Sequence, residues 1–145
     1  MSSFKEIVER VRLSGDYAEL IDAIPYAKTI GIMLDLDADT LSFKLPQKDS
    51  NIGNPLLPAI HGGVIGGFME LSAAMHLLVS QSTLKFPKII DFSLDYLRAG
   101  MNRDTYACCT VTRQGSRVAN VEIRAWQADR EQAIALARAH FLLEP

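Results

Sequence analysis

One segment of the chain, residues 58–80, restricts the possible folds more than any other because its only formal charge is Glu70. The segment is long and apolar enough to raise the question of a membrane-spanning helix. However, it contains four glycines and a carboxylate near its middle, and it lacks the basic flanks that anchor a spanning helix at the interface. We therefore interpret it as a helix buried in a soluble protein and beginning near His61.

Glu70 is the residue of this helix that most needs an explanation. A carboxylate among apolar side chains loses solvation worth on the order of several kcal/mol unless it is paired or used. One interpretation is a structural charge at a subunit interface or a solvent gap, satisfied by Arg98 or Arg124. We favour a catalytic carboxylate, because such groups collect at active sites.

The predicted helix starts with His61, Gly62 and Gly63. The first backbone N–H groups of a helix have no intrahelical acceptor and lie at the positive end of the helix dipole. Glycines there let a substrate carbonyl approach the backbone, and a thioester carbonyl gains negative charge in the transition state of hydrolysis. Such a helix start can hold an oxyanion, but on its own the pattern is explained at least as well by a glycine-rich helix start packed against a strand.

The spacing between these two features is itself informative. Glu70 follows His61 by nine residues, which is about two and a half helical turns. Within one chain the carboxylate and the helix start are therefore ~13 Å apart, too far to act on the same carbonyl. A two-fold dimer would bring the helix start of one chain beside the carboxylate of the other.

The N-terminal segment, residues 1–25, is predicted to be helical. The spacing of Phe4, Ile7, Val8 and Val11 is that of an amphipathic helix. A second short helix is expected over residues 16–23. Pro25 is expected to close it.

Strands are expected on both sides of the apolar helix. Residues 30–35 and 40–45 read as a hairpin around a turn at 37–39, and the stretch between Pro46 and Pro58 reads as a loop. After the helix, residues 90–96 alternate between apolar and polar with period two. Turn residues near 100–102, 114–116 and 129–130 then predict four strands in an antiparallel meander, each about ten residues long.

Composition excludes several classes of protein. The chain has 145 residues, about one domain, and its 15 Lys and Arg against 17 Asp and Glu give a net charge of −2. It offers no broad positive field for nucleic acid or anionic lipid. The adjacent Cys108 and Cys109 provide neither a disulfide framework nor a metal-binding spacing. We expect one domain over residues 1–145 in the cytoplasm, without metal or cofactor and with neither nucleic acid nor membrane as partner.

The motif His61-Gly62-Gly63-Val64-Ile65, with Glu70 nine residues after His61, resembles the helix of PaaI-type hotdog thioesterases. Residues 92–98 and 113–117 resemble strands that follow it in that family, so the similarity covers the chain from about Ile30 onward. It implies an α+β hotdog fold, in which a curved antiparallel sheet wraps a long central helix. It also implies homodimers with active sites at the interface, and dimers of dimers. It favours a strand for residues 131–143, which would pass as a helix on propensity.

The resemblance further implies roles for individual residues. Glu70 matches the carboxylate that acts as general base or nucleophile, and the Gly62 N–H matches the oxyanion donor. Asn54 matches a polar loop residue that orients the attacking water or the substrate carbonyl. His61 could act as a catalytic base, but its position in the family is better described as shaping the helix start by hydrogen bonding. The sequence departs from the family in two respects: Asp is more frequent at the position of Glu70, and the loop from Asn54 to His61 is one residue longer.

For the substrate, the apolar side chains around the helix start predict an acyl pocket. Gly63, Ile60 and Phe68 are candidates to contact the substrate there, and Arg98 is a candidate for the phosphates of coenzyme A. Such a pocket suits medium-chain and aromatic acyl groups equally.

The leading hypothesis is therefore hydrolysis of a small, medium-chain or aromatic acyl-CoA by a water that Glu70 activates. One alternative is hotdog hydratase or dehydratase chemistry on acyl thioesters, which needs a differently arranged His and acid. The other is a non-catalytic acyl-CoA-binding or regulatory module that keeps the pocket without turnover. Release of thiol, as against binding alone, discriminates between them.

Overall fold

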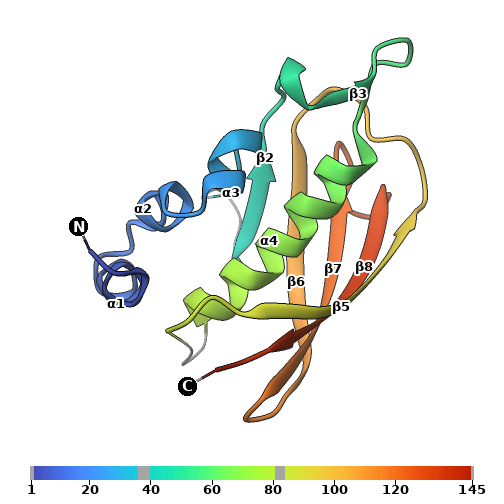
Figure 1. Cartoon of the computed structure of the whole chain (residues 1–145). Helices are drawn as coiled ribbons and strands as arrows, with labels where there is room; N and C mark the ends of the chain where they lie inside the picture. Colours follow the sequence, from blue (N-terminus) through green and yellow to red (C-terminus); the bar gives the residue numbers. More distant parts are fainter. Residues whose placement is uncertain (1, 36–39, 81–83, 145) are drawn as a thin grey trace.

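A long helix wrapped by a curved antiparallel sheet dominates the computed structural model, which describes residues 2–35, 40–80 and 84–144 (Figure 1). The helix is α4, Gly62–Ser80. In the described part of the chain, six strands form this sheet in the order β1 (Met33–Leu34), β2 (Ser42–Leu45), β6 (Thr105–Gln114), β7 (Val118–Trp126), β8 (Ala135–Leu142) and β5 (Lys88–Tyr96). The predicted α+β hotdog arrangement is confirmed.

Helix α4 is apolar on nearly every side and is buried accordingly. Phe68, Met69 and Leu77 point in different directions from its axis, and all three are fully buried. By length and composition alone the helix passes the test for a membrane span. Strands β2, β6, β7 and β8 and two N-terminal helices contact it, which makes it the core helix that the sequence predicts.

Strand β8 shows why a segment with high helix propensity becomes a strand. Ala135, Ala137, Ala139 and Phe141 are buried, and the residues between them lie on the other face of the sheet. Pairing with two neighbouring strands and a period of two outweigh the intrinsic preference of the sequence. The prediction of a strand within residues 131–143 is confirmed.

The predicted meander of four strands is wrong for its first member. Strands β6, β7 and β8 are neighbours in chain order, but β5 pairs antiparallel with β8. The expected turn at residues 100–102 is instead a connection across the end of the sheet. Gly100 lies there against the side chains of Ile65 and Ile134. This order leaves β5 with one long edge that pairs with no strand of the described chain.

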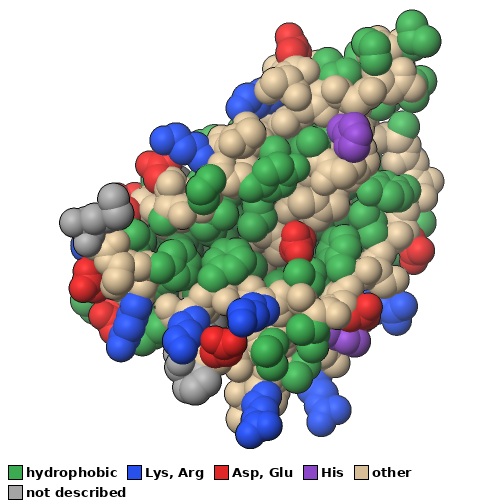
Figure 2. Space-filling view, viewed as in Figure 1, with side chains coloured by type: hydrophobic (Ala, Val, Ile, Leu, Met, Phe, Trp, Pro, Cys, Tyr) green, Lys and Arg blue, Asp and Glu red, His purple; other side chains and the backbone are tan. Residues whose placement is uncertain are grey.

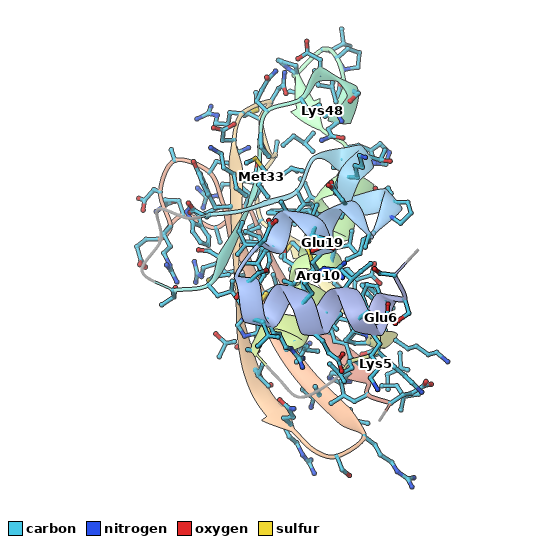
Figure 3. All side chains as sticks on the ribbon, turned by 90° about the vertical axis from the view of Figure 1, so that its left-hand side faces the viewer. Lys5, Glu6, Arg10, Glu19, Met33 and Lys48 are labelled. Atoms are coloured by element: carbon cyan, nitrogen blue, oxygen red, sulfur yellow. The ribbon has the colours of Figure 1, made fainter. Side chains whose placement is uncertain are left out.

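Three short helices pack beside α4: α1 (Phe4–Ser14), α2 (Tyr17–Asp22) and α3 (Pro25–Ile30). Arg10 of α1 forms an ion pair with Glu19 of α2, and Figure 3 shows these two side chains facing each other. Arg12 donates two hydrogen bonds, of 2.9 and 2.6 Å, to the carbonyl oxygen of Leu78 near the end of α4. A cation at a helix C-terminus is favourable, so this contact fixes the N-terminal helices on the core.

The predicted second helix is confirmed as α2, which ends at Asp22 before Pro25, but the helical segment as a whole does not end at residue 25. Pro25 is the first residue of α3, where its fixed φ suits a helix and its missing N–H removes no hydrogen bond. The helical segment therefore continues past residue 25 to Ile30, and Gly31 ends it in the left-handed conformation with φ of 91°. The hairpin is confirmed in shorter form as β1 and β2, and its predicted turn at 37–39 lies outside the described residues.

The stretch between Pro46 and Pro58 is also more regular than predicted. It contains a short 3-10 helix, Asp49–Asn51, and strand β3, Ile52–Asn54, which pairs with β4, Ala59–Ile60. Buried Asn51 donates a 2.9 Å hydrogen bond to the carbonyl oxygen of Ile30. This small hairpin leads directly into the start of α4.

Candidate active site

The side chain of His61 caps the start of α4. Its Nδ1 accepts a 2.9 Å hydrogen bond from the backbone N–H of Gly63, and its own backbone N–H donates to the carbonyl oxygen of Asn51 at 2.9 Å. A helix N-terminus needs such an acceptor because its first N–H groups have none within the helix. Since Nδ1 accepts, a neutral ring carries its proton on Nε2.

Two side chains hold the peptide between Gly62 and Gly63. His61 accepts from its N–H, and the phenol of Tyr96 donates a 2.7 Å hydrogen bond to its carbonyl oxygen. The next N–H, that of Val64, donates to the carbonyl oxygen of His61 at 2.9 Å. In the described part of the chain the Gly62 N–H donates to no acceptor, so it is the donor of the first turn that remains for a ligand.

Glu70 lies in the middle of α4 and is half-buried. Burial raises the pKa of its carboxyl group above the ordinary glutamate value, because the charged form loses water. No described side chain or backbone group forms a hydrogen bond or an ion pair with it. Arg98 donates instead to Gln132 at 2.7 Å and Arg124 to the carbonyl oxygen of Arg130 at 3.1 Å. Neither arginine satisfies Glu70 within one chain.

Gly63, Gly67 and Glu70 follow one another at intervals of four and three residues and therefore share one side of α4. We call this side the glycine face. Gly63 is exposed, and the other two residues are half-exposed. On this face Gly67 lies against Tyr26 of α3, and next to the face Gly66 lies against Leu94 of β5. The face is thus open between β5 and α3, and Figure 2 shows hydrophobic side chains gathered across the middle of this side of the molecule.

A cleft of about 340 Å³ lies beside the helix start. Of the residues predicted to form the site, Ile60, Gly62 and Arg98 line it, together with Tyr96. Phe68 does not line the cleft and is fully buried, with none of its surface accessible to solvent. The structure therefore places Phe68 among the core residues, because a position five residues after Gly63 is rotated by roughly 140° around the helix axis, away from the glycine face.

Comparison with known proteins decides the family. The profile of the thioesterase superfamily matches residues 57–134, which include the helix start and Glu70. The chain belongs to the thioesterase superfamily. No curated protein sequence matches the chain.

Solved structures share the fold of this chain. A crystal structure of a Chromobacterium violaceum protein is 47% identical, with 94% of this chain and 96% of that chain covered and a TM-score of 0.77. Two more distant structures share the fold. They are a Ralstonia eutropha phenylacetic acid degradation-related protein (20% identity, 87% and 98% covered, TM-score 0.71) and a Haemophilus influenzae thioesterase (15% identity, 88% and 89% covered, TM-score 0.73).

Asn54 lies on the small hairpin above the helix start of this thioesterase-superfamily chain. Its Oδ1 accepts a 3.1 Å hydrogen bond from the N–H of Leu56, which stabilises the turn between β3 and β4. Neighbouring Gly53 packs directly on His61, since a Cβ at Gly53 would lie 2.6 Å from the Cα of His61. The hairpin and the helix start are thus in close contact, and a role of Asn54 in orienting water stays a prediction.

Sequence reasoning missed two tyrosines at the site. Tyr96 appeared only as one apolar position of an alternating strand, and Tyr26 fell in a segment that was not expected to be helical. Both rings lie against glycines of α4. Glycines inside a helix lower its stability, so four of them at 62, 63, 66 and 67 are the signal that other groups approach the helix there.

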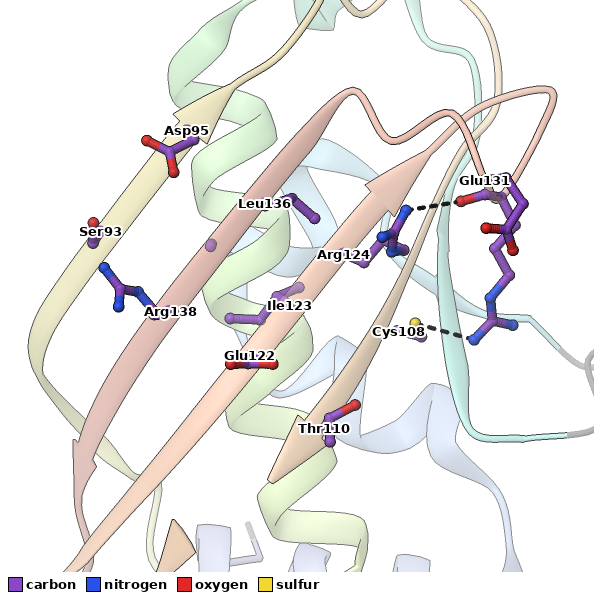
Figure 4. A pocket seen from close by; sticks show the side chains of 12 residues that line it. Ser93, Asp95, Cys108, Thr110, Glu122, Ile123, Arg124, Glu131, Leu136 and Arg138 are labelled. Atoms are coloured by element: carbon purple, nitrogen blue, oxygen red, sulfur yellow. Dashed lines mark hydrogen bonds between the residues drawn. The ribbon is translucent and has the colours of Figure 1, made fainter. Parts of the chain in front are cut away.

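The opposite face of the sheet carries a second cavity, of about 530 Å³ (Figure 4). Acidic and basic side chains alternate in it: Glu122 lies opposite Arg138 across β7 and β8, and Arg130 donates to the Sγ of Cys108 at 3.3 Å. None of the predicted site residues lines it. Cys109 points to the other side of β6, where burial raises the pKa of its thiol and disfavours a nucleophilic thiolate.

Proposed function

We propose that this chain is an acyl-CoA thioesterase that hydrolyses small, medium-chain or aromatic acyl-CoA substrates in the cytoplasm. One observation carries the proposal. A half-buried Glu70 without a described partner lies on the same helix as a Gly62 N–H that no described acceptor uses. Membership of the thioesterase superfamily indicates hydrolysis of a thioester. In the proposed reaction Glu70 is the base and the Gly62 N–H is the oxyanion donor that this hydrolysis requires.

In the proposed reaction Glu70 removes a proton from a water molecule while the oxygen of that water attacks the thioester carbonyl carbon. The carbonyl oxygen becomes an oxyanion and accepts a hydrogen bond from the Gly62 N–H, reinforced by the positive end of the α4 dipole. The carbon–sulfur bond then breaks. The departing thiolate of coenzyme A takes the proton that Glu70 holds, which leaves a carboxylic acid product and restores the carboxylate.

The two groups must come from two chains. Gly62 and Glu70 are eight residues apart on one helix, a distance of ~12 Å at about 1.5 Å per residue, which no single carbonyl spans. We propose a homodimer, and pairs of dimers, in which the helix start of one chain faces the partner's Glu70. Strand β5 supports a dimer, since one edge of its nine residues is unpaired in the described chain.

Exposed apolar side chains at β5 also support the homodimer. Ile90 is 57% exposed, and Leu97, directly after the strand, is 52% exposed. Pairing of two β5 strands about a two-fold axis would cover both residues and join the two sheets into one.

The proposed acyl pocket is apolar, with Ile60 and the ring of Tyr96 at the cleft beside Gly62. Arg98 lies in the same cleft, where a guanidinium suits the phosphates of coenzyme A. Gly63 offers no side chain and so leaves room for the substrate carbonyl beside the helix start.

A subunit-mixing experiment tests the shared site. Gly62→Pro removes the N–H donor while keeping the helix start, because Pro is favoured at the first helical position and the residue before it favours an extended conformation. Glu70→Gln removes the base. Each variant alone is expected to be nearly inactive. After denaturation and refolding together, about half of the dimers contain one chain of each kind, and each such dimer has one intact site of two.

The mixture is therefore expected to recover roughly a quarter of the wild-type activity. Gly62→Ala is the matched control, because it adds a Cβ at 3.2 Å from the Tyr96 Oη yet keeps the N–H. It should be far more active than Gly62→Pro. A mixture that stays as inactive as its two components would contradict a site shared between chains.

A further inference from the structure

Tyr26, the second residue of α3, occupies the place where a side chain at position 67 of α4 would be. A Cβ built on Gly67 would lie 2.7 Å from Cε2 and 3.3 Å from Oη of Tyr26, so only glycine admits the ring at this position. The ring is not a core residue, since 46% of Tyr26 is exposed. Its hydroxyl makes no hydrogen bond with a described residue, so no internal bond explains its position.

The contact places Tyr26 close to Glu70. Gly67 and Glu70 are three residues apart, and side-chain positions at this spacing are neighbours on the surface of a helix, about 5–6 Å apart between Cβ atoms. Glu70 therefore lies on the open glycine face, and the ring of Tyr26 bounds this face on the α3 side. On the β5 side the glycine face is bounded by Leu94, which lies against Gly66.

A thioester carbonyl attacked by the water that Glu70 activates must lie on the glycine face, and an acyl chain that extends away from the partner's helix start passes one of these two borders. Strand β5 belongs to the sheet and is held by its pairing with β8. Tyr26 is held only by packing, on a helix of six residues. An exposed aromatic ring without an internal hydrogen bond is also well suited to lie against an apolar or aromatic ligand.

We propose that Tyr26 is a specificity-determining residue that limits the length of the acyl group, an inference that rests on the proposed acyl-CoA thioesterase function. The ring closes the glycine face beside Glu70 on the α3 side and excludes acyl chains that would extend through the position of the ring. Truncation opens this space, so that additional methylene groups of a longer chain become buried. Each buried methylene is worth about a fourfold gain in transition-state binding.

The test compares kcat/KM for hexanoyl-CoA and dodecanoyl-CoA in wild type, Tyr26→Ala and Tyr26→Phe. The ratio of dodecanoyl-CoA to hexanoyl-CoA should rise at least about tenfold in Tyr26→Ala, because two or more extra methylenes become buried. It should stay within about twofold in Tyr26→Phe, which keeps the ring. Tyr26→Leu is a second truncated variant. Its side chain is shorter than that of Tyr but still apolar over Gly67, and it should raise the ratio as well. Tyr106→Ala, which removes an aromatic ring that stacks with Trp126, is the matched control and should leave the ratio unchanged.

An unchanged ratio in folded Tyr26→Ala and Tyr26→Leu would overturn the role of Tyr26 while leaving the thioesterase proposal intact. A wild type that hydrolyses neither of these substrates, nor any short-chain or aromatic acyl-CoA, would overturn the proposed function. In that case the ratio of the two dissociation constants, measured in Glu70→Gln with and without Tyr26→Ala, decides the role of Tyr26 by the same tenfold criterion. Absence of binding in both backgrounds would overturn both proposals.

Discussion

The phenol of Tyr96, the last residue of β5, donates a 2.7 Å hydrogen bond to the carbonyl oxygen of Gly62, the first residue of α4. Its ring also covers Gly62, whose Cβ would lie 3.2 Å from the Tyr96 Oη. The strand with the unpaired edge is therefore connected to the proposed oxyanion donor. Because glycine has wide conformational freedom, such a bond restricts the helix start more than it would at another residue.

Removal of the Tyr96 hydroxyl should slow the chemical step. One hydrogen bond contributes about 0.5–1.5 kcal/mol, so Tyr96→Phe is expected to lower kcat by roughly 2–12-fold and to leave KM nearly unchanged. Steady-state kinetics with the best acyl-CoA substrate measure both parameters. Tyr106→Phe is the control, since Tyr106 stacks on Trp126 on the outer face of the sheet. A Tyr96→Phe enzyme with altered KM alone would assign Tyr96 to substrate binding.

Gly53 should be among the least replaceable glycines of the chain. Its missing Cβ would lie 2.6 Å from the Cα of His61, a backbone atom that cannot move without displacing the start of α4. We expect Gly53→Ala to reduce the free energy of unfolding by about 2–3 kcal/mol and Tm by roughly 5–10 °C. Gly115→Ala is the matched control, because the nearest atom to its Cβ is 3.6 Å away. Equal Tm values for the two variants would contradict the close contact at Gly53.

His61 should prove to be a capping residue. Loss of its Nδ1 acceptor in His61→Ala leaves the Gly63 N–H without a partner and is expected to cost about 1 kcal/mol of stability. His61→Asn restores a side-chain acceptor and should recover most of the stability and most of kcat. A general base at this position would contribute about 10²–10⁴-fold to the rate. A stable His61→Asn variant with a loss of that size would show that His61 is a base.

The apolar helix and the alternating strands are the parts of the fold that the sequence predicts best. Residues 62–80 form a helix that is apolar on nearly every side and therefore lies in the interior. The alternation of buried and exposed side chains with a period of two specifies β7 and β8, even where Ala, Leu and Arg favour a helix. Strand order is a different matter. Pairing of β5 with β8 depends on where the connection around Gly100 passes the end of the sheet, and no local pattern encodes that path.

Prediction of the site follows the same division. His61, Gly62 and Glu70 could be proposed from the sequence because a glycine-rich helix start and an isolated charge are features of one continuous segment, and their roles in catalysis stay predictions. Tyr26 and Tyr96 were not found, since each acts through a glycine that is at least 34 residues away in sequence. Phe68 was assigned to the substrate because it is apolar and near Glu70 in sequence, but its direction on the helix places it in the core.

Glu70 should make the folded protein less stable at neutral pH than a neutral side chain would. Burial raises the pKa of Glu70 in the folded chain above its unfolded value. The stabilisation linked to its protonated form is therefore fully present below the ordinary glutamate pKa and is lost as pH rises through the raised pKa. We expect Glu70→Gln to raise Tm by on the order of a few °C at pH 8, and this difference should shrink at pH 4.

Thermal melting of both proteins across that pH range measures the effect. Glu131→Gln changes an exposed carboxylate after the end of β7 and serves as the control. A Glu70→Gln protein that is less stable than wild type at pH 8 would indicate that Glu70 has a stabilising partner in the dimer.

The most direct test of the central claim is thiol release from short, medium, long and aromatic acyl-CoA substrates by wild type and Glu70→Gln. We predict turnover of at least one medium-chain or aromatic acyl-CoA by the wild type. Glu70→Gln should lower kcat by about 10²-fold or more, because the general base is lost. Equal turnover by the two proteins would contradict a catalytic role of Glu70. Binding of acyl-CoA by a folded, dimeric wild type without release of thiol would contradict the enzyme and favour a binding module.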